Sequence, residues 1–259
     1  MKRSHRLYLL ALLTLLAFIV MLTLKPISQA TAYHHFCDTR TLWGIPNFAN
    51  VISNFPFLVI GIAGLARLPK RQSMPTPSGA PPPKRPPIPG PIRASYCCLF
   101  IGIALTGIGS TYYHWSPNDD TLVFDRLPIT IVFMSLLAAI TGESIGPRMA
   151  AVTLISLLLA GAGSIWWWHY SGDLRPYVLV QYYPILLIPA ILLLFPSQAG
   201  NRGWPPLLWA IGWYALAKVF DQLDCPIYSL GGLVSGHTLK HLAAAVSTAL
   251  LVKRFRIVH

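Results

Sequence analysis

The sequence ASYCCLFIGIALTGIGSTYY occupies residues 94–113 and contains no charged side chain. An α-helix needs roughly 20 predominantly apolar residues to cross the hydrocarbon core of a bilayer, so this stretch predicts a transmembrane helix. Similar runs recur along the chain at 7–24, 48–67, 124–142, 149–168, 177–195, 206–221 and 235–252. The sequence therefore predicts an all-α, polytopic membrane helix bundle, with a seven-helix core and an additional N-terminal hydrophobic segment.

Composition and charge distribution agree with a membrane protein. The mean hydropathy is +0.55, and 54% of residues are hydrophobic whereas 11% are charged, which excludes an ordinary soluble domain. The net charge of +12 could suggest a nucleic-acid partner, but most basic residues lie on one side of the predicted membrane. An excess of Lys and Arg marks the cytoplasmic side, so both termini are predicted to be cytoplasmic and no nucleic-acid partner is expected. The fourteen residues on that side are Lys2, Arg3, Arg6, Arg67, Lys70, Arg71, Lys84, Arg85, Arg93, Arg148, Arg202, Lys253, Arg254 and Arg256.

The N-terminal segment, residues 1–32, has two interpretations. Its basic start, apolar stretch and Ala30-Thr31-Ala32 resemble a secretory signal with a cleavage site. Its apolar stretch is longer than the usual signal core of about 7–15 residues, which favours a transmembrane helix. In both cases residues 33–259 form the main domain, and Tyr33 begins outside the cytoplasm.

Residues 69–93 interrupt the apolar pattern with ten prolines together with Lys, Arg and Ser. Such a composition cannot bury a core and predicts a Pro-rich cytoplasmic loop with polyproline bias. A solvated linker is the simpler interpretation, and a partner-binding loop is the alternative.

The four cysteines divide by their positions relative to the predicted helices. Cys97 and Cys98 lie inside a helix and are expected to be packing residues. Cys37 and Cys225 fall in segments that face outward, where disulfides are permitted. The sequence therefore predicts a Cys37–Cys225 bridge.

Histidines within the apolar segments indicate a metal site. His237 and His241 are four residues apart, so they share one face of a helix, and His114 follows the run 94–113. Three neutral imidazoles leave a fourth position open, which is the arrangement of a catalytic zinc. Ionisable groups in a membrane are costly and mark function by default. We therefore predict one Zn²⁺ per chain, bound by His114, His237 and His241.

The predicted topology places Ser110 and Asp125 at the same outer depth as the histidines. A zinc ion makes a nucleophile from water near neutral pH. Asp125 could act as general base and then general acid, and Ser110 could donate to a developing oxyanion. Together these residues predict metal-assisted hydrolysis of an amide or ester bond in a lipid.

Other interpretations of the polar residues stay open. A ligand-sensing or non-catalytic membrane protein with a structural zinc is the main alternative, and a haem protein with axial histidines is another. Lys218 and Asp221 are one turn apart and predict a neutralising pair. Lys240 has no predicted role.

Five motifs together resemble the alkaline ceramidase family, within the CREST superfamily of seven-helix membrane hydrolases. They cover roughly residues 36 to 252, and the most specific are the Ser-x-x-x-His and His-x-x-x-His pairs. The resemblance implies a zinc held by His114, His237 and His241, with Ser110 and Asp125 as catalytic partners. It also implies hydrolysis of the ceramide amide to a sphingoid base and a free fatty acid. The motifs are Phe36-Cys-Asp38, Asn50-Val-Ile-Ser-Asn54, Gly107-Ile-Gly-Ser-Thr-Tyr-Tyr-His114, Asp125-Arg-Leu-Pro128 and His237-Thr-Leu-Lys-His241.

One segment departs from the family pattern. Eukaryotic members carry an acidic calcium-binding stretch where this chain has one carboxylate, Asp38, and a cation, Arg40, two residues later, and Asn47 replaces a further glutamate. Calcium prefers six to eight oxygen ligands with several carboxylates, so we expect the calcium site to be absent. The small size and the Pro-rich loop fit a bacterial relative in the inner membrane, with its active site toward the periplasm and an acyl-amide lipid as substrate.

Overall fold

The computed structural model describes residues 1–69, 87–196 and 200–259. Within these ranges the chain is built from α-helices, with two short 3-10 turns at Thr31–His34 and Gly200–Gly203. The α-helices are α1 (Arg3–Thr23), α2 (Phe48–Ile52), α3 (Phe55–Ala66), α4 (Gly90–Trp115), α5 (Asp119–Ser144), α6 (Pro147–Ser171), α7 (Arg175–Leu194), α8 (Trp204–Gln222), α9 (Asp224–Ser229) and α10 (Gly236–Val258).

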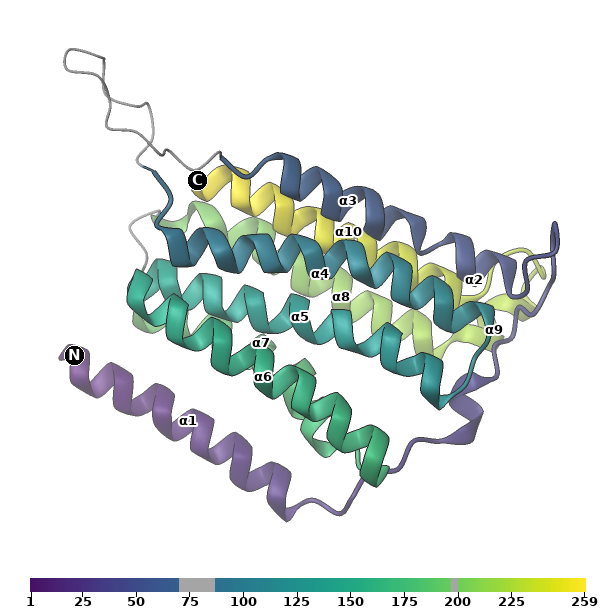
Figure 1. Ribbon diagram of the computed structural model, residues 1–259, viewed down its shortest axis with the longest axis horizontal. Coiled ribbons are helices and arrows are strands. Elements are labelled where there is room, and N and C mark those ends of the chain that lie inside the picture. Colours follow the sequence, from purple (N-terminus) through teal and green to yellow (C-terminus); the bar gives the residue numbers. More distant parts are fainter. Residues whose placement is uncertain (70–86, 197–199) are drawn as a thin grey trace, which may run out of the picture.

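The long helices form one bundle of antiparallel neighbours (Figure 1). Helix α4 packs against α3 and α5, and α5 packs against α6 and α7. Helix α10 lies between α3 and α8, while α1 packs along α7 at the edge of the bundle. The chain is therefore an all-α helix bundle with one peripheral N-terminal helix, as predicted.

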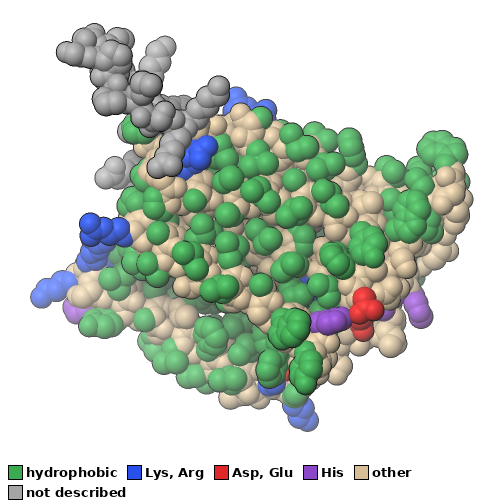
Figure 2. Space-filling model, viewed as in Figure 1, with side chains coloured by type: hydrophobic (Ala, Val, Ile, Leu, Met, Phe, Trp, Pro, Cys, Tyr) green, Lys and Arg blue, Asp and Glu red, His purple; other side chains and the backbone are tan. Residues whose placement is uncertain are grey.

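Six of the described helical segments are long and apolar enough to cross a membrane: Arg3–Thr23, Phe48–Ala66, Gly90–Trp115, Asp119–Ser144, Pro147–Ser171 and Arg175–Leu194. The remaining two predicted segments are helices α8 and α10, which lie in the same bundle but carry the polar side chains described below. Hydrophobic side chains cover the face seen in Figure 2, and Lys and Arg gather mainly at the end that holds both termini. This arrangement is that of a multi-pass membrane protein.

Helix α4 begins earlier than the sequence indicates. The Pro-rich loop was expected to reach residue 93, but Gly90–Arg93 already form the first turn of α4. Proline is tolerated in a first turn because the N–H that it lacks has no helical partner there. Residues 70–86 of the predicted loop lie outside the described residues.

One end of the bundle is defined by the end of α4 and the starts of α5 and α10, and we name it the histidine end. Asn118 caps α5 through a reciprocal capping box with Thr121. Ser235 caps α10 by accepting a hydrogen bond from the N–H of Thr238. These caps determine where the two helices begin, and they position the polar residues in their first turns.

Glycines allow α4 to approach its neighbours closely. A Cβ atom at Gly107 would lie 2.8 Å from the backbone nitrogen of Leu58 on α3. A Cβ at Gly109 would lie 1.9 Å from the carbonyl oxygen of Phe124 on α5. Small residues commonly permit such contacts between membrane helices. Gly109 therefore brings the adjacent Ser110 toward Asp125.

Gly109→Ala is expected to destabilise the bundle, because a methyl group cannot fit against the Phe124 carbonyl unless α4 and α5 move apart. Overpacking of this kind costs about 1–3 kcal/mol or more. The matched control is Gly163→Ala on α6, where nothing lies within 4 Å of the added Cβ. Thermal unfolding in detergent should show a lower midpoint for Gly109→Ala alone. Equal midpoints for both variants would show that the close approach is not required.

The segment between α1 and α2 crosses the histidine end. Cys37 and Cys225 form a disulfide, with Cα atoms 5.2 Å apart, which confirms the predicted bridge. Closer to α1, the Leu174 N–H donates to the carbonyl of Ile27 at 2.8 Å. Hydrogen bonds from Arg175 lower the pKa of Asp173 to about 2, so this carboxylate stays charged near neutral pH. The crossing segment is thus bonded to the bundle at both of its ends.

Candidate metal centre

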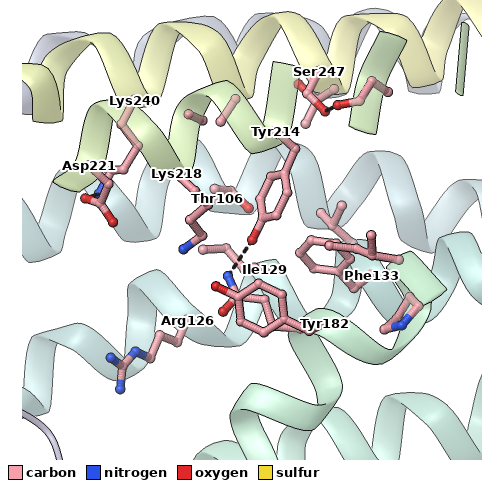
Figure 3. A pocket seen from close by; sticks show the side chains of 18 of the residues that line it. Thr106, Arg126, Ile129, Phe133, Tyr182, Tyr214, Lys218, Asp221, Lys240 and Ser247 are labelled. Carbon is pink, nitrogen blue, oxygen red and sulfur yellow. Dashed lines mark hydrogen bonds and ion pairs between the residues drawn. The ribbon is translucent and has the colours of Figure 1, made fainter. Parts of the chain in front are cut away.

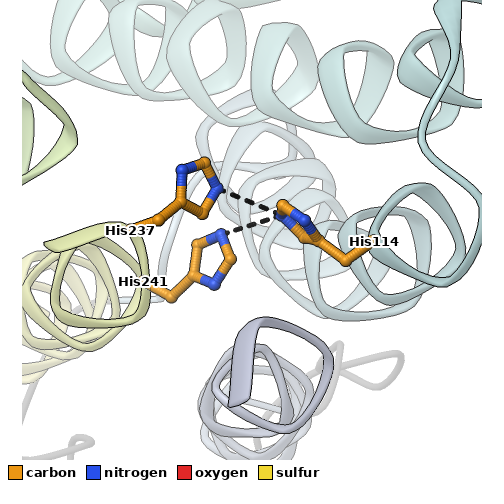
Figure 4. Close-up of side chains that lie close together, drawn as sticks. All are labelled: His114, His237 and His241. Atoms are coloured by element: carbon orange, nitrogen blue, oxygen red, sulfur yellow. Dashed lines mark hydrogen bonds between the residues drawn. The ribbon is translucent and has the colours of Figure 1, made fainter. Parts of the chain in front are cut away.

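Three buried histidines from two distant helices converge at the histidine end (Figure 4). The Nε2 atom of His114 lies 3.2 Å from Nε2 of His241 and 3.3 Å from Nε2 of His237. Their exposed fractions are 1%, 5% and 4% for His114, His241 and His237. Three imidazole nitrogens that meet in this way could hold a metal ion.

The second ring nitrogen of two of these histidines, Nδ1, has the kind of partner that is typical of a metal ligand. Nδ1 of His241 lies 2.7 Å from the Ser53 hydroxyl, and Nδ1 of His237 lies 3.3 Å from Oδ1 of Asp221. Histidine ligands usually have a hydroxyl, carbonyl or carboxylate at the second nitrogen, which fixes the tautomer and the ring orientation. Nδ1 of His114 is buried and has no hydrogen-bond partner among the described residues. The Nε2 atoms of all three rings point toward one centre, and in two of the rings a partner at Nδ1 helps to hold this orientation.

Ser53→Ala is expected to weaken metal binding, because the ring of His241 loses the partner that holds it in place. Losing such a partner typically costs about 10–100-fold in affinity. Competition with a chelator of known affinity would measure the change in the purified protein. Ser95→Ala is the matched control, since the Ser95 hydroxyl donates to the carbonyl of Pro91 within α4. Unchanged affinity in Ser53→Ala would contradict an orienting role for this hydroxyl.

Backbone contacts position two of the histidines. Asp224 accepts hydrogen bonds from the N–H groups of His237, at 2.7 Å, and Cys37, at 3.0 Å. Asn47 donates to the carbonyl of His114 at 2.9 Å. The ring of Phe36 lies 4.7 Å, centroid to centroid, from the rings of both His114 and His237. The crossing segment therefore covers the cluster and joins its two helices.

A cavity of about 370 Å³ opens beside the histidines, among α4, α5, α7, α8 and α10 (Figure 3). Ser110, Asp125 and His241 line it together, so the structure brings the predicted site residues of three helices to one space. The exposed fractions of Ser110 and Asp125 are 2% and 9%. Most of the remaining wall is apolar, including Val132, Phe133, Leu136, Ile185, Ile188, Leu207, Ile211 and Leu251. The cavity has a polar part next to an apolar part, which suits a ligand with a polar group and a hydrocarbon chain.

Asp221 pairs differently from the sequence-based prediction. Its Oδ1 lies 3.2 Å from Nζ of Lys240, and this ammonium is 2.7 Å from Nε2 of His237, the nitrogen that also faces His114. The expected partner, Lys218, instead lies 5.8 Å from the ring centroid of Tyr214. The reason is geometric: Asp221 faces α10, where a second ammonium is closer.

Sequence reasoning missed five polar residues at this site: Ser53, Asp221, Lys240, Asp224 and Asn47. Ser53 lies in the quoted motif Asn50–Asn54, but no role followed from the motif alone. Asp221 is an acidic residue in an apolar segment, which signals function, but its spacing from Lys218 predicts only a local pair. Asp224 and Asn47 form hydrogen bonds with backbone groups of distant residues, and the order of side chains in the sequence does not predict such bonds.

The Ceramidase family model matches residues 28–256, which is nearly all of the chain. The chain belongs to this family. The match spans the crossing segment, the three histidines and the cavity. A search of curated proteins found no match. Membership in this family implies hydrolysis of ceramide by an amide hydrolase of the membrane.

Proposed function

We propose that this protein is a zinc-dependent intramembrane amidohydrolase that cleaves ceramide-like lipids to a sphingoid base and a free fatty acid. His114, His237 and His241 would hold the zinc ion. The observation that carries the proposal is the convergence of three imidazole nitrogens beside a cavity that Ser110 and Asp125 also line. When bound, zinc would supply Lewis acidity and a nucleophile from water at neutral pH.

The residues of the chain have separate roles in this reaction. The Asp125 carboxylate takes a proton from the attacking water and delivers it to the amide nitrogen as the carbon–nitrogen bond breaks. The Ser110 hydroxyl donates a hydrogen bond to the carbonyl oxygen as it gains charge. The apolar wall binds the acyl chain and excludes water from the polar part of the cavity.

We also propose that the histidine end faces away from the cytoplasm, in a bacterial inner membrane. The gathering of Lys and Arg at the opposite end supports this orientation. The Cys37–Cys225 disulfide supports it too, because disulfides persist in oxidising compartments. The substrate would then enter from the outer leaflet.

The test is to incubate the purified protein with ceramide and a panel of other amide-linked lipids and to measure the released fatty acid. Release is expected from at least one lipid, with loss of release on addition of a chelator and recovery on addition of Zn²⁺. Metal content measured on the same sample should be close to one zinc per chain. Release that continues in a metal-free sample would contradict the proposal.

A further inference from the structure

The cavity beside the histidines contains a lysine, Lys218, that lies outside the Asp221–Lys240 ion pair. It lies on α8 and lines the cavity, and the ring of Tyr214 is near its ammonium. Within the part of the chain that the structure describes, no hydrogen bond or ion pair engages Lys218, since Asp221 pairs with Lys240. A charged side chain within a membrane protein is costly unless it is paired, so it usually marks a functional site.

Arg126 provides a second, independent observation in the same cavity. Its exposed fraction is 4%, and its guanidinium lies 4.2 Å from the ring centroid of Trp168 and 4.9 Å from that of Tyr177. Nη2 donates to Oε1 of Gln29, but Nη1 is buried and has no partner among the described residues. Leaving a buried donor unsatisfied costs free energy, so Arg126 keeps one N–H group for which its described surroundings supply no acceptor.

The charges that line the cavity do not balance. Three cations, Arg126, Lys218 and Lys240, accompany two carboxylates, Asp125 and Asp221. Figure 3 shows Lys218 extending from the α8 side of the cavity toward the α5 side, where Arg126 lies. The space next to the histidines therefore carries one uncompensated positive charge, in surroundings of low dielectric where a bound anion would be strongly attracted.

We infer that this cavity binds acyl-amide lipids that carry an anionic group, a carboxylate or a phosphate, on the amine side of the amide. Lys218 receives that group, with Arg126 as a second donor. The acyl side of such a lipid is hydrocarbon and fits the apolar wall, so only the amine side can present a charge to these cations. This inference deepens the proposed hydrolase and rests on it for the position of the amide.

Binding can be tested separately from hydrolysis in a Ser110→Ala background, which keeps both carboxylates of the cavity, using N-dodecanoylglycine and N-dodecanoylethanolamine. These probes share the chain and the amide, but only the first carries a carboxylate. Calorimetry in detergent is expected to show about tenfold or more tighter binding of the glycine conjugate, as for hydrogen bonds to charged groups. Phosphorylated N-dodecanoylethanolamine forms a further arm, and the tighter of the two anionic probes identifies the anion.

Variants of Lys218 connect the preference to this side chain. In Lys218→Met the ratio of anionic to neutral affinity is expected to fall toward one, and Lys218→Arg should restore most of it. Lys253→Met removes the same charge from an exposed position on α10 and should leave the ratio as it is. Unfolding midpoints of all variants would show that each is folded.

Two results would overturn the inference. One is an equal affinity for the neutral and anionic probes in the Ser110→Ala protein that carries Lys218. The other is binding of dodecanoate that is as tight and as dependent on Lys218 as that of the glycine conjugate, since the cation would then hold the fatty-acid carboxylate. Selective binding without hydrolysis by the unmodified protein would instead contradict the proposed function and leave the binding preference standing.

Discussion

His237→Ala is expected to abolish both metal binding and lipid hydrolysis. The variant removes one of three nitrogens that meet within hydrogen-bonding distance, and two imidazoles alone make a weak site for zinc. Metal catalysis supplies several kcal/mol of transition-state stabilisation, so the rate should fall roughly a thousandfold or more. Metal content per chain and fatty-acid release measured on one preparation would check both effects.

The matched control for this variant is His169→Ala. His169 is exposed on α6, near the same end of the bundle, where its Nε2 lies 3.8 Å from Asp120. It should keep one metal ion per chain and full hydrolysis. If His237→Ala kept both its metal and its activity, the three-histidine centre would be the wrong assignment.

Asp125→Asn is expected to keep the metal and lose hydrolysis. The amide occupies the same volume in the cavity wall but cannot take a proton from water. Loss of a general acid–base group typically lowers the rate by about 10²–10⁴-fold. Single-turnover release of fatty acid, together with metal content, would separate this effect from loss of the ion.

Asp120→Asn on the same helix provides the control, because Asp120 is exposed and five positions earlier on α5. Its turnover should equal that of the unmodified protein. Unchanged turnover in Asp125→Asn would remove its acid–base role. Loss of metal from that variant would make the carboxylate a ligand instead.

The helix bundle could be predicted from the sequence because its signals are local. Apolar length predicts spans, and an i, i+4 spacing places His237 and His241 on one face. Charge asymmetry then gives a relative direction for each helix, which places His114 and Asp125 at the same depth as the pair. The convergence of the histidines followed from these local rules alone.

Other parts of the site depend on tertiary packing, which local patterns do not encode. Ser53 reaches His241 because α2 packs beside α10, and Asp221 faces Lys240 because α8 is rotated toward α10. A rotation of α2 or α8 by one residue, about 100° around the helix axis, would bring other side chains to face His241 or Lys240. The same limit explains why the sequence predicts Lys218 as the partner of Asp221, whereas the ion pair is formed with Lys240.

The contacts of the crossing segment have a consequence for biosynthesis. Cys37 must wait for Cys225, which follows 188 positions later, and His114 must wait for α10 to bring His237 and His241. Until α10 has been synthesised, the three histidines cannot come together, and the crossing segment cannot pack over them. In the proposed hydrolase the metal site would therefore be completed only after the last helix has entered the membrane, so an unfinished chain would not cleave the lipids around it.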